Sequence, residues 1–251
     1  MKDGKLGYAV VGLGIGMAHA DAAYEYEKCK LVAVCDLKPE RLEKAKEKYE
    51  RFDELLCDKE VDVISICLPS GMHAEFACRA MEAGKHVLVE KPIDISVDAA
   101  EKICECAKRT GMKAGVIHQN NNAVMKPIKE AIDSGRLGRL VLGTFAVKWF
   151  REQRYYDNGW HGTWNMDGGG SLMNQAIHTV DLMQWLMGDV TSVNSRMGIF
   201  EHKIETEDLT ASVVTFKSGA IATFVSTTCA YPGISTEISV YGTDGTIEAD
   251  A

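Results

Sequence analysis

Short apolar runs alternate with stretches of helical periodicity through the first half of the chain, and this alternation restricts the fold more than any other feature. Short runs rich in β-branched residues are typical of strands buried on both faces of a parallel sheet. The runs are Leu6–Val11, Lys30–Cys35, Val61–Leu68, His86–Val89 and Lys113–Ile117. The helical stretches between them are Gly16–Glu27, Pro39–Tyr49, Met72–Ala83 and Val97–Thr110. We therefore predict a doubly wound α/β sheet over residues 1–119, with a further strand that we cannot place within residues 49–60.

The pattern changes after Ile117. Met125–Ser134 and Ser171–Met187 have the apolar spacing of helices, and Val141–Phe150 is typical of a long strand. Apolar and polar residues then alternate toward the end of the chain, with hairpin signals at residues 217–219 and 242–245. We predict that residues 120–251 form a second, α+β domain with a large, mostly antiparallel sheet that is open on one face.

Composition excludes several classes of function. The formal net charge of -8 argues against a nucleic-acid partner, which would require a basic face. The eight cysteines include no Cys-x-x-Cys pair and most of them lie in apolar segments, so we predict no metal site. The sequence has neither an apolar leader nor a run of the roughly 20 apolar residues that a membrane span needs. We expect a cytoplasmic protein with no membrane association.

The first apolar run leads into a glycine-rich turn, Gly12-Leu13-Gly14-Ile15-Gly16. Glycines between a buried strand and a helix allow backbone amides to approach a pyrophosphate, as in the dinucleotide-binding site of a Rossmann domain. The usual third glycine would stand at position 17, where this chain has methionine, so an ordinary strand–helix turn remains an alternative. Asp36 ends the second strand, where a carboxylate can accept both ribose hydroxyls of an adenosine. Since that carboxylate would repel a 2′-phosphate, we expect NAD rather than NADP.

Two later strands end in polar tripeptides. Leu68-Pro69-Ser70 follows one strand, with His73 opening the next helix, and Glu90-Lys91-Pro92 follows another. Ligands of open parallel sheets lie at the carboxyl ends of the strands, so both tripeptides should border one crevice. A charged Glu-Lys pair at a strand end is equally well explained as ordinary surface. Position alone does not decide whether Lys91 takes part in chemistry.

These residues resemble the Gfo/Idh/MocA oxidoreductases over essentially the whole chain. The run Ala83-Gly84-Lys85-His86-Val87 through Glu90-Lys91-Pro92 carries the resemblance most specifically, together with residues 11–14, 34–36, 69–73 and 168–181. The resemblance implies that Lys91 lies near the nicotinamide and the substrate hydroxyl. It also implies homodimers or homotetramers that associate through the open sheet. The cofactor contacts that we expect are Gly12, Gly14, Ile15, Gly16, Asp36, Pro69, His73, Glu90, Lys91 and Gln119.

The second domain supplies the other half of the expected site. By resemblance, His178 is the general base, and Asn174 stands four residues before it, where many relatives have aspartate. Helical spacing would place Asn174 and His178 on one face. We expect Asn174, Arg151, Trp164 and Asp181 to bind substrate, although the aromatic residues would equally suit packing under a loop. The asparagine and the aromatic segment most resemble the subgroup similar to UDP-N-acetylglucosamine 3-dehydrogenases.

We therefore predict a hydride transfer between NAD and a secondary alcohol of a sugar, a sugar nucleotide or a cyclitol. The alternative is a protein of the same fold that binds NAD as a sensor and does not catalyse a reaction. The chain stops inside an expected strand at residues 246–251, and proteins that it resembles continue further. We expect that the C-terminal end is missing.

Overall fold

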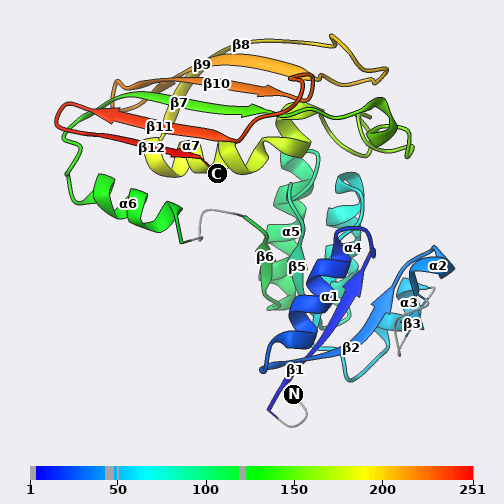
Figure 1. The fold of residues 1–251 in the computed structure, drawn as a ribbon. Helices are drawn as coiled ribbons and strands as arrows, with labels where there is room; N and C mark the ends of the chain where they lie inside the picture. The colour runs from blue at the N-terminus through cyan, green and yellow to red at the C-terminus, as the bar shows by residue number, and fades with distance from the viewer. Residues whose placement is uncertain (1–3, 43–47, 50, 119–122, 251) are drawn as a thin grey trace. The chain divides into compact units, whose positions relative to one another are not determined.

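The computed structural model describes residues 4–42, 48–49, 51–118 and 123–250 (Figure 1). It divides into two compact units, Met1–Ile117 and His118–Ala251. Each unit is built around one six-stranded sheet.

The first unit is the predicted doubly wound sheet, with all strands parallel in the order β3-β2-β1-β4-β5-β6. Its strands are β1 (Leu6–Val11), β2 (Cys29–Cys35), β3 (Lys48–Tyr49), β4 (Val63–Ile66), β5 (His86–Val89) and β6 (Ala114–Val116). Its helices are α1 (Gly16–Glu25), α2 (Pro39–Leu42), α3 (Phe52–Leu56), α4 (His73–Glu82) and α5 (Val97–Thr110), with a 3₁₀ turn at Ser70–Met72. The α/β prediction is confirmed.

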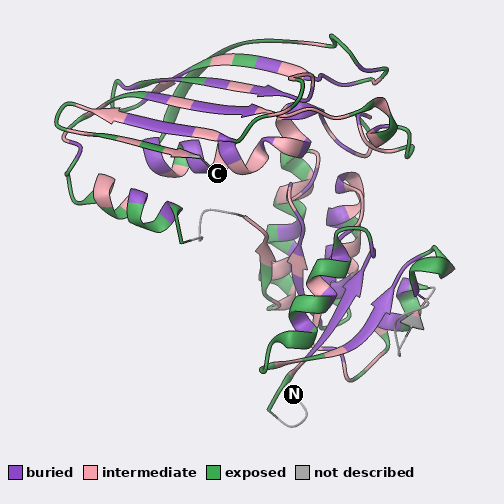
Figure 2. Ribbon diagram, viewed as in Figure 1, coloured by how far each residue is buried: buried purple, intermediate pink, exposed green. Residues whose placement is uncertain are grey.

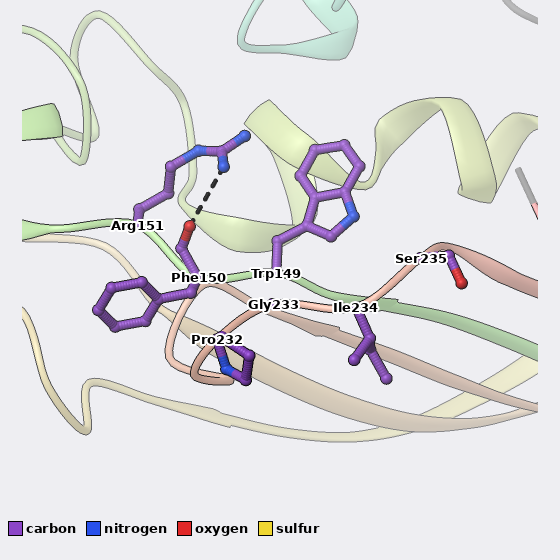
Figure 3. A pocket seen from close by; sticks show the side chains of 7 residues that line it. All are labelled: Trp149, Phe150, Arg151, Pro232, Gly233, Ile234 and Ser235. Carbon is purple, nitrogen blue, oxygen red and sulfur yellow. Dashed lines mark hydrogen bonds between the residues drawn. The ribbon is translucent and has the colours of Figure 1, made fainter.

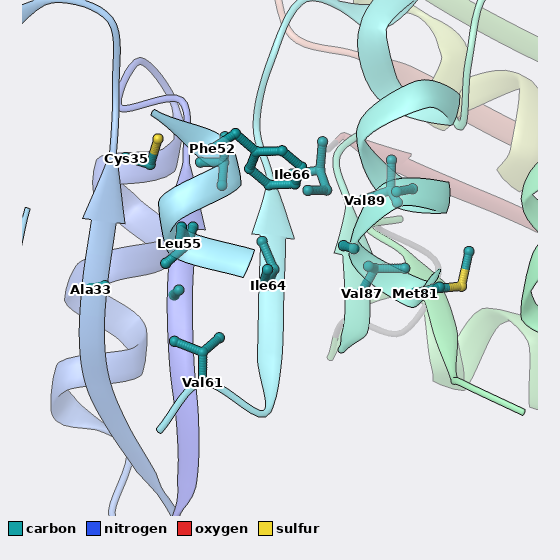
Figure 4. Packing of buried hydrophobic residues seen from close by; sticks show 14 of the residues in the cluster. Ala33, Cys35, Phe52, Leu55, Val61, Ile64, Ile66, Met81, Val87 and Val89 are labelled. Carbon is teal, nitrogen blue, oxygen red and sulfur yellow. The ribbon is translucent and has the colours of Figure 1, made fainter. Parts of the chain in front are cut away.

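The apolar runs are almost continuous because both faces of the sheet are covered. Successive residues of a strand point to opposite faces. In β1, Ala9 and Val11 join the core cluster beneath α3, α4 and α5, whereas Tyr8 and Val10 join a second cluster against α1. Figure 4 shows the first of these clusters, in which the aliphatic side chains of β4 and β5 pack against α3 and α4.

The predicted helix Pro39–Tyr49 is wrong at its C-terminal end. Pro39–Leu42 are described as helix α2, whereas Lys48–Tyr49 form β3, which pairs in parallel with Val34–Cys35 of β2. Tyr49 pairs with Cys35 at the edge of the sheet and packs against the first core cluster. These contacts favour the strand over the predicted helix at this residue. Tertiary packing overrides local helical spacing in this segment. Residues 43–47 and 50 lie outside the described part of the chain.

The second unit has a mostly antiparallel sheet in the order β12-β11-β7-β10-β9-β8, as predicted, with β7 and β10 as its parallel pair. The strands are β7 (Leu140–Lys148), β8 (Val190–Gly198), β9 (Leu209–Phe216), β10 (Ile221–Thr227), β11 (Glu237–Gly242) and β12 (Thr246–Asp250). The helices are α6 (Met125–Asp133) and α7 (Ile177–Met187), with a 3₁₀ turn at Gln153–Tyr155 and a short π-helix at Ser171–Gln175. Helix α7 lies along one face of the sheet (Figure 1), where Leu182 and Leu186 pack against Phe145 and Phe224.

The predicted helix Ser171–Met187 is confirmed over Ile177–Met187, but Ser171–Gln175 form a separate π-helix, with Ala176 between the two. Glu207 accepts hydrogen bonds from the backbone at the start of the π-helix. Gly170 N and Leu172 N donate to the Glu207 carboxylate at 2.9 and 2.8 Å, and Ser171 N donates to the Glu207 carbonyl at 2.9 Å. A Cβ on Gly170 would lie 1.7 Å from that carbonyl oxygen, so only glycine allows this approach. Asn174 therefore lies on the π-helix and His178 on the first turn of α7, so the two residues do not belong to one uninterrupted α-helix.

The face of this sheet away from α7 carries exposed apolar side chains. Leu142, Ile221 and Val213, on three adjacent strands, are 40%, 46% and 47% exposed. Figure 2 shows that β8, at the sheet edge, is exposed almost throughout. In the described parts of the chain, no helix is both long enough and apolar enough to cross a membrane.

Candidate active site

The glycine turn after β1 is built for close approach of the backbone. Gly12 has a φ of +86°, and a Cβ at this position would lie 2.4 Å from the Cys67 carbonyl oxygen. A Cβ on Gly16 would lie 2.8 Å from Val10 Cγ1, so Gly16 allows α1 to pack closely on the sheet. This is the role that the third glycine of the usual fingerprint has at position 17. Gly14 lies in open space, where the nearest atom to a Cβ is Arg41 Nη1 at 3.9 Å.

Helix α1 begins without the groups that normally satisfy a helix N-terminus. Ile15 is its N-cap, 61% exposed, with no side-chain hydrogen bond to the cap, and the first turn contains no acidic residue. Backbone amides at such an end, together with the helix dipole, favour an anion. The turn therefore fits the pyrophosphate of a dinucleotide.

Alanine substitutions should separate folding from binding in this turn. We expect Gly12→Ala to destabilise the fold by about 1–3 kcal/mol, because φ is positive and the added Cβ overlaps a carbonyl. Gly14→Ala should leave the thermal midpoint within about 2 °C of the parent, since its Cβ has space. It should still weaken NAD binding, because the methyl group would occupy the surface offered to the pyrophosphate. Thermal unfolding and calorimetry with NAD check both results, and equal destabilisation by the two variants would contradict this account.

Asp36 follows β2 and lies beside the same turn. Its Oδ2 accepts hydrogen bonds from Leu13 N at 2.7 Å and from Arg41 Nη1 at 3.3 Å, and its Oδ1 accepts one from Lys38 N at 2.8 Å. Burial alone would raise the pKa of Asp36, but these donors hold it below its ordinary value. The carboxylate is ionised near neutrality and keeps acceptor capacity for a ribose hydroxyl.

His73 connects the loops that follow β4 and β5. It is almost wholly buried, and its Nδ1 and Nε2 lie 2.8 Å from the carbonyl oxygens of Pro92 and Leu68, respectively. A direct hydrogen bond from His73 to a cofactor would require breaking one of these bonds. Pro69 stands at the start of the 3₁₀ turn in the same loop. Gln119, which we also expected to contact the cofactor, lies outside the described residues.

Glu90 and Lys91 follow β5, and a histidine that we had not predicted joins them. The buried Glu90 carboxylate accepts from Lys91 N at 3.0 Å through Oε2, and its Oε1 lies 2.8 Å from Nε2 of His19 on α1. The other ring nitrogen of His19, Nδ1, lies 2.7 Å from Ser65 Oγ on β4. The backbone of Lys91 is thus tied to a buried acidic group that also contacts α1.

In the second unit, Asn174 is the centre of a polar network and not an isolated side chain. Its Oδ1 accepts from Tyr155 Oη at 3.2 Å and from Gln175 Nε2 at 2.6 Å, and its Nδ2 donates to the buried carboxylate of Asp167. Tyr155 Oη also lies 3.2 Å from His161 Nε2. These hydrogen bonds orient Asn174, so its amide could meet a substrate hydroxyl only in a direction that the network allows.

Arg151 lies beside this network, just beyond the end of β7. Its Nη2 donates to Gln175 Oε1 at 3.1 Å, and its guanidinium lies 5.2 Å from the Trp149 ring centroid and 5.4 Å from that of Tyr155. Figure 3 shows Trp149 and Arg151 projecting to the same side of the chain. They border an open pocket of about 360 Å³ that is completed by Phe150, Pro232, Gly233, Ile234 and Ser235. A cation framed by aromatic faces suits an anionic group attached to a ring.

His178, at the start of α7, lies next to a second histidine. The rings of His178 and His118 are perpendicular, with centroids 5.6 Å apart, and His118 Nδ1 lies 3.6 Å from Asp181 Oδ2. The structure therefore places His178 and Asp181 in one polar cluster, with His118 as a member that sequence reasoning missed. Trp164 is 50% exposed, and within the described chain no hydrogen bond or ring contact joins its indole to Asn174, Arg151 or Asp181.

Models of two protein domains match the chain in succession. Residues 6–118 match an oxidoreductase family with an NAD-binding Rossmann fold, and residues 125–248 match a GFO/IDH/MocA C-terminal domain. Together these matches cover both structural units.

Two solved structures are similar over the whole chain. The WlbA dehydrogenases from Chromobacterium violaceum and Bordetella pertussis, each in complex with NADH and UDP-GlcNAcA, superpose with a TM-score of 0.95. The two WlbA chains are 32% and 31% identical to this chain. The match covers 100% of this chain and 75% and 78% of the respective WlbA chains. The myo-inositol 2-dehydrogenase of Thermotoga maritima is 28% identical over 96% of this chain and 74% of its own length.

Proposed function

The chain belongs to the Gfo/Idh/MocA family of NAD-binding oxidoreductases, and from that premise we propose that it transfers a hydride between NAD and a secondary alcohol of a sugar, a sugar nucleotide or a cyclitol. The observation that carries the proposal is the position of Lys91. It follows β5 at the carboxyl edge of the parallel sheet, the same edge that bears the glycine turn after β1.

The first unit would hold the cofactor. Gly12 and Gly14 would let the backbone approach the pyrophosphate at the N-terminus of α1, with Ile15 and Gly16 beginning that helix. Asp36 would accept the ribose hydroxyls, and its negative charge favours NAD over its 2′-phosphorylated form. When bound, NAD⁺ supplies the acceptor for the hydride that leaves the carbinol carbon.

The side chains of this chain would handle the proton. We assign His178 as the base that accepts the hydroxyl proton while the C–O bond becomes a carbonyl, since imidazole ionises near neutrality. Lys91, as an ammonium ion, would donate a hydrogen bond to the same oxygen and stabilise its developing negative charge. In the reverse direction, the imidazolium of His178 would return the proton to the alkoxide.

The second unit would select the substrate. Arg151 offers a cation between aromatic faces, and Asn174 offers an amide held by Tyr155 and Gln175. We propose that these residues bind a sugar ring with an anionic substituent, with Asp181 and Trp164 as further contacts. The ligands of the two WlbA relatives, which join a nucleoside diphosphate to a uronic acid, have this chemistry.

A substrate panel tests the proposed function. Calorimetry should show NAD binding, and the absorbance of reduced nicotinamide should rise with at least one of UDP-GlcNAcA, UDP-N-acetylglucosamine, free hexoses or myo-inositol. NAD binding without reduction of the cofactor across that panel would instead support the NAD-binding sensor. Absence of NAD binding at millimolar concentration would overturn the cofactor assignment as well.

We further propose that a second copy of the chain covers the exposed sheet face, in a homodimer or a homotetramer. Ile221 lies opposite Leu142 in the β7–β10 register, and both are exposed apolar side chains. Ile221→Glu should therefore shift light-scattering mass toward the monomer, because it would bury a carboxylate. Val193→Glu is the matched control: Val193 is 57% exposed, but it pairs with Val214, which faces the core. Dissociation by the control alone would place the interface elsewhere.

A further inference from the structure

We propose that His19 is a positioning residue for Lys91: paired with Glu90, it balances the buried carboxylate and so weakens the attraction of that carboxylate for the Lys91 ammonium. The consequence for a substrate oxygen rests on the role proposed above for Lys91. The charge balance among His19, Glu90 and Lys91 does not, and it can be measured without turnover.

The geometry brings together three elements of the first unit. His19 lies on α1, three residues after Gly16, and its side chain is 13% exposed. Its Nε2 lies 2.8 Å from Glu90 Oε1, and its Nδ1 lies 2.7 Å from the hydroxyl of Ser65, which is wholly buried in β4. Glu90 Oε2 accepts from Lys91 N at 3.0 Å, so both carboxylate oxygens have a donor.

The buried ion pair with Glu90 favours the cationic form of the imidazole. The neighbouring Cys67 sulfur and the Glu90 carboxylate raise the pKa of His19 to about 10. Burial would raise the pKa of Glu90, but His19 and Lys91 together hold it below its ordinary value. Other titratable groups around the pair are Tyr8 from β1, whose pKa burial raises, and Cys67 after β4. Near neutrality the charged groups here are therefore His19, Glu90 and Lys91.

Two positive neighbours share one carboxylate. The charge of Lys91 lowers the pKa of Glu90, and by reciprocity the charge of Glu90 favours the ammonium form of Lys91. His19 offsets part of that attraction. Without the His19 charge, the attraction between the Glu90 carboxylate and the Lys91 ammonium would be stronger.

The experiment follows the reactivity of Lys91 itself. Acetic anhydride modifies neutral amines, so peptide mass spectrometry of the labelled protein over a range of pH gives the midpoint of Lys91 ionisation without any substrate. His19→Gln should raise that midpoint by about 1 pH unit, because the carboxylate is no longer balanced. Glu90→Gln should lower it. The double variant, which removes one positive and one negative charge, should return close to the parent value.

Several measurements keep the result interpretable. Lys30, which is exposed and paired with Glu60, serves as the reference lysine within each sample, and its midpoint should stay constant. Thermal unfolding of each variant shows that it is folded at the pH of labelling. With an identified substrate, kcat of His19→Gln should fall about tenfold, the scale of one charge-assisted hydrogen bond, and should recover partly in the double variant.

The labelling decides this proposal. Identical Lys91 midpoints in the parent and in all three folded variants would overturn it, as would a double variant that shifts as far as His19→Gln. If the midpoints shift as expected but Lys91→Met retains turnover, the charge balance stands and the assigned role of Lys91 in the reaction fails.

Discussion

Lys91→Met should lower kcat by about 10²–10⁴-fold, the usual scale for a positioned polar group that stabilises charge in the transition state. Methionine keeps the length and apolar stem of lysine and removes the ammonium group. The glycine turn and Asp36 are untouched, so NAD affinity measured by calorimetry should stay within about tenfold of the parent. Steady-state kinetics on the substrate identified by the panel would measure the loss.

Lys30→Met is the matched control, because Lys30 is exposed on β2 and forms a surface ion pair with Glu60. Surface pairs of this kind contribute roughly 0–1 kcal/mol, so this variant should keep parental turnover and stability. Near-parental turnover of Lys91→Met would contradict the role assigned to Lys91. A loss of NAD binding comparable to the loss of turnover would show that Lys91 serves the cofactor more than the substrate.

His178→Asn should also lower kcat by about 10²–10⁴-fold, because asparagine can hydrogen-bond but cannot accept a proton. The parent rate of alcohol oxidation should fall as pH decreases, because a protonated imidazole cannot accept the hydroxyl proton. In the variant this acid limb should disappear, since the remaining rate does not depend on that proton transfer. A pH series of kcat measures both effects.

His86→Asn is the control for this substitution. His86 is the first residue of β5, at the opposite end of that strand from Lys91, and its Nδ1 accepts a hydrogen bond from Lys113 N at 3.1 Å. It should lose little activity and keep the acid limb. If that limb persisted in His178→Asn, another group would be the base, and His118 beside it would be the first to test.

The parallel sheet and the position of Lys91 could be predicted from sequence because both depend on local patterns. A strand buried on both faces requires a continuous apolar run, and parallel strands place the residues that follow them at one edge. His19 could not be predicted in the same way. Its partners Ser65 and Glu90 are 46 and 71 residues away in sequence. Only the packing of α1 against the sheet brings them within hydrogen-bonding distance.

The arrangement of Asn174 and His178 illustrates the opposite error. Their spacing of four residues suggested one uninterrupted α-helix, but Ser171–Gln175 form a π-helix, and Gly170 and Leu172 at its start donate hydrogen bonds to Glu207. Glu207 is 37 residues from Gly170, so the cause is tertiary. Periodicity describes a helix that is free to continue, and it carries no information about a contact that interrupts one. Asp167 was missed for a similar reason, because its hydrogen bond with Asn174 also depends on tertiary structure.

The position of β7 in its sheet also determines when this strand can pair during synthesis of the chain. Its neighbours are β10 and β11, which begin at Ile221 and Glu237, whereas β7 ends at Lys148. A chain emerging from the ribosome would present β7 with both edges unpaired while some seventy further residues are made. The parallel sheet of the first unit, whose strands all precede residue 117, can assemble during that interval. Unpaired apolar strands aggregate readily, so we expect chaperones to bind mainly the second unit during synthesis. The pairing of β10 and β11 with β7 should limit the rate of refolding.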